Sequence, residues 1–183
     1  ETYEWDNVWI EHANEIGRKR VAYIGDSISV GTRRIATART NEEILFDGFG
    51  TSKALDNPYF KDSIRLFLKQ LPNIDTVLFN NGLHGWNLDD GIEYKALYDE
   101  MIQFILGEIK GTKLYILLTT AVAKDADDER VKFRNIAARE IAEKYAIPII
   151  DLYNITSVNI NEISSDGVHP TEPLYEKIAD EII

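Results

Sequence analysis

The sequence predicts a doubly wound α/β protein in which helices cover a parallel sheet of five strands. Five short segments are apolar except at their ends and do not alternate with polar residues, which is typical of strands that are buried on both faces. Segments with helical periodicity separate most of them, as the crossovers between parallel strands require. The predicted strands are residues 20–24, 43–46, 76–80, 113–119 and 148–151.

The helices are predicted from apolar residues that recur every three or four positions. The clearest stripe contains Tyr94, Leu97, Tyr98, Met101, Ile102, Ile105 and Ile109. A second stripe contains Phe133, Ile136, Ala137, Ile141 and Tyr145, and it follows Asp127, Asp128 and Glu129, whose charges suit a helix N-terminus. Shorter helices are predicted around residues 64–71 and 174–182.

The chain of 183 residues shows no linker, repeat or low-complexity tract, and we therefore expect one domain over residues 1–183. Residues 1–19 form a polar lead before the first predicted strand. Trp5 and Trp9 are four positions apart, which on a helix would place both rings on the side that docks against the protein.

Composition excludes several classes of function. The formal charge of -11 disfavours binding to nucleic acid and to anionic membranes. The absence of cysteine removes disulfides, thiolate nucleophiles and cysteine-ligated metal sites. No apolar run approaches the roughly 20 residues of a membrane span. The first residue is Glu1 rather than Met, which is compatible with removal of an export signal, so the compartment and the oligomeric state stay open.

Polar and glycine-rich segments follow the predicted strands, at the sheet edge where ligands bind in doubly wound folds. Gly25-Asp26-Ser27 follows the first strand, residues 47–50 the second and residues 80–84 the third. The segment 164–170, just before the last helix, is expected to reach the same edge.

Two of these segments carry the residue types of nucleophilic catalysis. Ser27 at a strand-to-helix corner attacks an acyl carbon only if a base takes its proton, and histidine suits that task. His169 is the candidate base, and Asp166, three residues earlier, can accept its Nδ1 proton and fix its orientation. His12 precedes the first strand and is expected to be a surface or packing residue.

These segments resemble the sequence blocks of the SGNH or GDSL hydrolases. "YIGDSIS" resembles block I, "GFGTS" block II and "DGVHPTE" block V, and the resemblance extends from Arg20 to the final helix. It implies a flavodoxin-like three-layer α/β/α fold, Ser27 as nucleophile and Asp166 and His169 as its partners. It also implies that the backbone N–H groups of Ser27 and Gly50 stabilise the oxyanion.

The third block departs from the family pattern. The family has Gly-x-Asn-Asp, in which the Asn donates to the oxyanion, whereas this chain has Gly82-Leu83-His84-Gly85. A neutral imidazole with a proton on the facing nitrogen can donate the same bond, so His84 is the expected third donor. Asn80 and Asn81 lie close by and are the alternatives.

Three residues are candidates for substrate contact, and Asn81 beside the third block is one of them. Asp26 precedes the nucleophile, although a carboxylate at this position is more typical of a turn whose backbone N–H groups it binds. Trp86 can offer a flat face to a sugar ring or pack at the rim.

The predicted function is serine-dependent hydrolysis of a small carboxylic ester, such as an O-acetyl group on a carbohydrate, through an acyl-enzyme and without a cofactor. Esterase, lipase, deacetylase and acyltransferase activities are all implied by the resemblance. One alternative is a non-catalytic carbohydrate- or ligand-binding module on the same fold. Another is a metal site at His84 and His169, for which two histidines in separate loops provide no ligand spacing.

Overall fold

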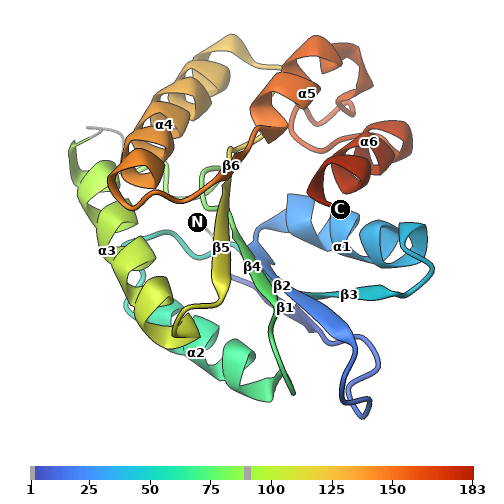
Figure 1. Ribbon diagram of the computed structural model, residues 1–183. Helices are drawn as coiled ribbons and strands as arrows, with labels where there is room; N and C mark the ends of the chain where they lie inside the picture. The colour runs from blue at the N-terminus through green and yellow to red at the C-terminus, as the bar shows by residue number, and fades with distance from the viewer. Residues whose placement is uncertain (1–2, 89–91) are drawn as a thin grey trace.

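A six-stranded sheet forms the centre of the protein. The computed structural model describes residues 3–88 and 92–183. The strands are β1 (Asp6–Trp9), β2 (Lys19–Gly25), β3 (Ile44–Thr51), β4 (Thr76–Phe79), β5 (Lys113–Leu117) and β6 (Ile149–Ile150). Their order is β1-β3-β2-β4-β5-β6, and every neighbouring pair is parallel except β1 and β3 (Figure 1).

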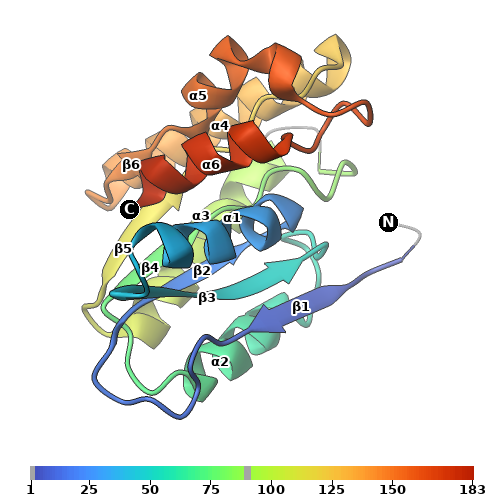
Figure 2. The same cartoon turned by 90° about the vertical axis from the view of Figure 1, so that its right-hand side faces the viewer.

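Helices cover both faces of this sheet. They are α1 (Ser27–Arg39), α2 (Phe60–Gln70), α3 (Ile92–Ile109), α4 (Asp125–Lys144), α5 (Leu152–Val158) and α6 (Glu172–Ile182), with a short 3-10 turn at Ile160–Glu162. Side chains of α2, α3 and α4 share one hydrophobic core, and those of α1, α5 and α6 pack into a second core on the opposite face. The predicted three-layer α/β/α fold is therefore confirmed, and Figure 2 shows α1 and α6 on one side of the sheet and α2 on the other.

The sheet differs from the prediction at one edge. We expected five parallel strands, but β1 adds a sixth strand that pairs antiparallel with β3, from Asp6 opposite Thr51 to Trp9 opposite Gly48. Residues four positions apart lie on the same face of a strand as well as of a helix, so the spacing of Trp5 and Trp9 could not distinguish the two.

Strand β3 is also longer than predicted. Residues 47–50 were expected in a loop, yet β3 continues through them to Thr51. Position 50 has no room for a side chain, because an added Cβ atom would lie 2.4 Å from Val30 Cγ2 and 3.1 Å from the Asp26 carbonyl oxygen. This glycine lets the start of α1 pack closely on the sheet.

Helix α4 buries only part of the predicted stripe, in which Ala137 and Ile141 are 4% and 3% exposed. Phe133 and Ile136, expected on the buried stripe, are 51% and 56% exposed. The buried positions include Arg134 and Asn135, whose polar groups bind the backbone of neighbouring loops. In α3, by contrast, the predicted residues Tyr94, Tyr98, Met101, Ile102, Ile105 and Ile109 are buried as expected.

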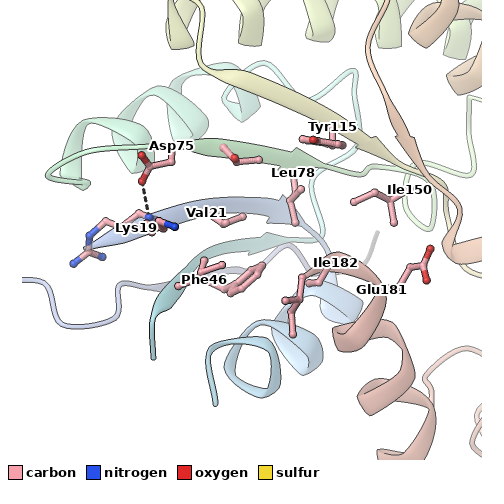
Figure 3. Close-up of a pocket in the computed structure, with 13 residues that line it drawn as sticks. Lys19, Val21, Phe46, Asp75, Leu78, Tyr115, Ile150, Glu181 and Ile182 are labelled. Carbon is pink, nitrogen blue, oxygen red and sulfur yellow. Dashed lines mark hydrogen bonds between the residues drawn. The ribbon is translucent and has the colours of Figure 1, made fainter. Parts of the chain in front are cut away.

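The amino ends of the strands border a cavity of about 370 Å³. Figure 3 shows Val21, Phe46, Leu78, Tyr115, Ile150 and Ile182 around it. These side chains come from the starts of β2 and β3, from β4, β5 and β6, and from the end of α6. Because Ser27 follows the carboxyl end of β2, this apolar cavity lies at the opposite end of the strands from the predicted nucleophile.

Candidate active site

Ser27 stands where β2 turns into α1. It is the first residue of α1, and Asp26 is the N-cap, with its Oδ1 accepting a hydrogen bond from the Ile28 backbone N–H at 2.9 Å. The first N–H groups of a helix have no acceptor within the helix and carry its positive end. The turn therefore presents the serine hydroxyl together with backbone groups that favour negative charge.

His169 connects this serine to a carboxylate. Its Nε2 lies 2.8 Å from Ser27 Oγ, and its Nδ1 lies 2.8 Å from Asp166 Oδ2. The structure thus brings together three residues whose sequence positions span 142 places. Both distances lie within normal hydrogen-bonding range, and the order serine, imidazole, carboxylate is that of a nucleophile, its base and the group that orients the base.

The loop before α6 fixes this geometry. The backbone N–H groups of His169 and Val168 donate to Asp166 Oδ1 at 2.9 and 2.8 Å. These two bonds, followed by the bond from the His169 side chain, hold the pKa of the Asp166 carboxyl well below its usual range. Asp166 therefore stays ionised and keeps its second oxygen for the imidazole.

His84 borders the same cavity as these three residues. The cavity measures about 330 Å³, and its walls are formed by Ser27, Leu83, His84, Trp86, Val122, Asp127, Asp166, Val168 and His169. The ring of His84 also meets Trp5 edge-on, with ring centroids 6.2 Å apart. His84 is thus placed in the cavity wall beside the nucleophile, and its donation to an oxyanion stays a prediction.

The two alternatives to His84 have other partners. Asn80 Nδ2 donates to Leu117 O at 2.8 Å and to Thr119 Oγ1 at 3.0 Å, which uses both of its hydrogens. Asn81 Nδ2 donates to the Lys53 carbonyl at 2.9 Å. Both asparagines are buried, and these bonds fix strand ends and loops. Contact of Asn81 with substrate therefore stays a prediction.

Gly50 lies inside β3, opposite Asn7 of β1. Ser52 N–H donates to the Trp5 carbonyl at 3.1 Å, and the alternation of an antiparallel ladder makes Asn7 and Gly50 the next hydrogen-bonded pair. This places the Gly50 N–H on the β1 side of the strand. The ladder gives no support to its role as an oxyanion donor, which stays a prediction.

Asp26 is buried beneath the nucleophile. Its exposed fraction is 2%, and burial raises the pKa of its carboxyl, although the nearby His84, the bond from Ile28 and His169 oppose that shift. The capping bond agrees with the expected turn role. Substrate contact by Asp26 stays a prediction.

Trp86 lies against helix α4 as well as the cavity. The guanidinium groups of Arg130 and Arg134 lie 5.0 and 4.8 Å from its ring centroid. Both guanidinium groups thus pack near the same indole ring that borders the cavity. The role of Trp86 as a sugar platform stays a prediction.

The remaining candidates lie elsewhere. His12 is partly exposed and approaches Glu15 at 3.0 Å and Glu42 at 3.3 Å, which confirms its expected surface position. Within residues 3–88 and 92–183, no group of three or more His, Cys, Asp or Glu side chains is arranged to hold a metal ion. In the same part of the chain, no helix is both long and apolar enough to cross a bilayer.

The similarity of this chain to known proteins lies in its fold. No family model and no curated protein sequence matches the chain. Solved structures do match it. An acetyl xylan esterase is 17% identical with a TM-score of 0.66, and the match covers 89% of this chain and 97% of the esterase.

Two further structures agree. A lipase/acylhydrolase from Enterococcus faecalis has 15% identity and a TM-score of 0.64 over 90% of this chain and 93% of its own. A GDSL-like lipase from Bacteroides thetaiotaomicron has 16% identity and a TM-score of 0.67 over 90% and 85%. The chain has the SGNH/GDSL hydrolase fold. In this fold, His169 stands within hydrogen-bonding distance of both Ser27 and Asp166, the residues singled out with it from the sequence.

Proposed function

We propose that this protein hydrolyses a small carboxylic ester through an acyl-enzyme formed on Ser27. The observation that carries the proposal is the position of His169, 2.8 Å from the Ser27 hydroxyl on one side and 2.8 Å from the Asp166 carboxylate on the other. A serine hydroxyl is a weak nucleophile, and an oriented neutral imidazole within hydrogen-bonding reach is the group that activates it.

The reaction proceeds in two halves. Ser27 Oγ attacks the ester carbonyl while His169 Nε2 takes its proton, and the new imidazolium is stabilised by Asp166. The tetrahedral intermediate collapses as His169 returns the proton to the leaving alcohol. Water then attacks the acyl-enzyme, His169 again takes and returns a proton, and the carboxylic acid leaves Ser27.

The oxyanion of each intermediate needs donors close to Ser27. The Ser27 N–H at the start of α1 and the His84 imidazole in the cavity wall are the groups we assign to it. The donor role of His84 requires a proton on the ring nitrogen that faces the substrate.

The cavity limits the size of the substrate. A volume of about 330 Å³ accommodates a short acyl group and part of its alcohol. Asp127 and Asp166 in the wall disfavour an anionic ester, because like charges repel. An O-acetyl group on a neutral carbohydrate fits both conditions, and a protein with the same fold is an acetyl xylan esterase.

Labelling with a fluorophosphonate tests this proposal. Wild-type protein should be phosphonylated on Ser27 and should release acetate from p-nitrophenyl acetate and from acetylated xylo-oligosaccharides. Ser27→Ala should remove labelling and lower kcat by roughly 10⁴–10⁶, because no other group replaces the nucleophile. Ser157→Ala is the matched control, since Ser157 Oγ donates to the Asn154 carbonyl of α5 at an exposed position.

The outcomes separate the alternatives. Wild-type protein that binds acetylated sugar but is never labelled on Ser27 would be a binding module. Transfer of the acetyl group to an added alcohol in preference to water would make it an acyltransferase. A folded Ser27→Ala protein with near wild-type kcat would contradict the nucleophile assignment.

A further inference from the structure

One arginine of helix α4 holds the backbone of the loop that carries His84. Arg134 is 3% exposed, and its guanidinium donates to three carbonyl oxygens. Nη1 binds the carbonyls of Gly82 at 3.0 Å and His84 at 2.6 Å, and Nη2 binds that of Gly85 at 2.6 Å. The three hydrogen bonds thus hold the backbone of His84, which we assign as an oxyanion donor, and of the two glycines near it.

The rest of the loop is packed around the same guanidinium. The rings of Trp86 and Tyr94 lie 4.8 and 4.6 Å from it. The Tyr94 hydroxyl in turn donates to the carbonyl of Asn81. The side chains of α4 and α3 therefore fix this loop from its first residues to Trp86.

Both glycines of the loop are closely packed on other sides. A Cβ atom on Gly82 would lie 1.8 Å from Thr119 Oγ1, and one on Gly85 would lie 2.5 Å from Ala54 Cβ. Gly85 also has a φ of +71°, a conformation that favours glycine. The loop is therefore held between α4, the end of β5 and the segment after β3.

These contacts explain why an arginine occupies this position. Buried carbonyl groups need donors, and one planar guanidinium with five N–H groups in fixed directions can supply several at once. A lysine ammonium has only three N–H donors on a flexible stem. Arg134 thereby replaces the hydrogen bonds that a regular secondary structure would otherwise provide.

We propose that Arg134 is the positioning residue for the oxyanion site: it acts through the loop 82–86 to hold the His84 imidazole beside Ser27. This inference rests on the proposed function. Arg134 touches no reacting atom, and its effect on the chemistry comes from the backbone of His84. A displacement of about 1 Å at such a donor can cost on the order of 10²-fold in rate.

The test compares Arg134→Met and Arg134→Lys with the wild-type protein. Arg134→Met should lower kcat roughly 10- to 100-fold with little change in KM, because a donor to the oxyanion acts mainly in the transition state. Arg134→Lys should recover part of that loss. In a His84→Ala background, Arg134→Met should change kcat by less than about 3-fold, since the group it positions is already gone.

Arg20→Lys provides a matched control. Arg20 is also buried and also binds three backbone carbonyls, those of Glu11, His12 and Glu15, at 2.8, 2.9 and 3.2 Å. It lies at the amino end of β2, remote from Ser27. Arg20→Lys should reduce Tm while leaving the kcat of the folded protein unchanged.

Hydrogen–deuterium exchange supplies a measurement that needs no activity. Arg134→Met should accelerate exchange within residues 80–88, and Arg20→Lys should not. Unchanged exchange in this segment, or an Arg134→Met loss of kcat that persists in full in the His84→Ala background, overturns the positioning role. If Arg134→Met does not fold, Arg134→Lys and Tyr94→Phe, which removes only the bond to Asn81, decide by the same two measurements.

Different results would contradict the proposed function and the positioning role. Wild-type protein that is not labelled on Ser27 contradicts the esterase proposal, and the exchange data still decide whether Arg134 holds the loop. Labelled wild-type protein whose Arg134→Met variant reacts with the fluorophosphonate at an equal rate contradicts the positioning role alone.

Discussion

At the scale of single residues, both carboxylate oxygens of Asp166 take part in hydrogen bonds. Oδ1 accepts two backbone N–H groups, and Oδ2 accepts the proton of His169 Nδ1. Asp166→Asn should lower kcat by roughly 10⁴, because an amide allows the wrong tautomer of the imidazole.

The pH profile checks the same assignment. The pKa of Asp166 is held well below its usual range, so its carboxylate stays ionised at neutral and mildly acidic pH. Activity should therefore fall with a slope no steeper than one as pH decreases, because Asp166 adds no ionisation of its own in that range. A slope of two, or a folded Asp166→Asn protein with wild-type kcat, would contradict this role.

His84 gives a second prediction for a single residue. If the imidazole donates to the oxyanion, His84→Ala should lower kcat by roughly 10²–10³ and change KM little. His84→Asn supplies an amide donor and should recover much of that rate. Measurement of kcat, KM and Tm for both variants decides the matter, because a packing role would lower Tm and leave the kcat of the folded protein unchanged.

Asp26 links burial to the pH dependence of stability. Burial raises the pKa of its carboxyl, so the folded protein binds this proton more tightly than the unfolded chain does. The stability contributed by Asp26 should then fall as pH rises from the ordinary aspartate value, about 3.9, through the raised folded value. Asp26→Asn keeps an oxygen for the Ile28 N–H and removes the charge. It should increase Tm at pH 8 relative to wild type, and the increase should disappear at pH 3.5. An equal Tm difference at both pH values would contradict the effect of burial.

At the scale of elements, α4 shows where sequence patterns mislead. Its predicted stripe included Phe133 and Ile136, which are exposed, and omitted Arg134 and Asn135, which are buried. Asn135 Oδ1 accepts the Thr119 N–H at 2.8 Å, and its Nδ2 donates to the Thr119 carbonyl at 2.9 Å. A hydrophobic pattern cannot reveal such residues, because their partners are backbone groups that only the folded chain brings close.

The unequal burial of the predicted stripe on α4 has a measurable consequence. Ile141 is 3% exposed and belongs to the core, so Ile141→Ala should reduce the free energy of unfolding by about 2–5 kcal/mol. Phe133→Ala should change it by less than about 1 kcal/mol, because half of that side chain is already exposed. Urea denaturation of both variants measures the difference, and equal losses would show that Phe133 contributes to the core as much as Ile141 does.

Local sequence patterns predict the other elements to different degrees. Buried strands such as β2 and β4 were predictable because they are apolar except at their ends. The end of β3 was not, since Asp47, Gly48 and Gly50 are typical of loops. Asp47 is instead buried in an ion pair with Arg20, at 2.8 Å. The polar and glycine residues of a strand can therefore be explained only by partners distant in sequence.

At the scale of the whole molecule, the topology explains which parts of the site could be predicted. Parallel strands bring their carboxyl ends to one edge, so Ser27 and the loop of Asp166 and His169 were expected to meet there. The support for His84 could not be predicted in this way. Arg134 lies in the middle of a helix, where an arginine is ordinarily exposed, and no motif marks it.

The N-terminal segment is joined to the same region. The Trp5 carbonyl accepts hydrogen bonds from Ser52 N–H and Thr51 Oγ1 at 3.1 Å each, and Lys53 Nζ binds Asp6 at 2.6 Å. Strand β1 lies at the edge of the sheet and all four of its residues are exposed, so its local opening, or fraying, costs less free energy than opening of the buried strands. Here such fraying would release the segment 51–53 and the ring beside His84 while the central sheet remains intact. On the proposed function, loss of activity would then precede global unfolding, and the edge strand β1 rather than the core would set the lifetime of that activity.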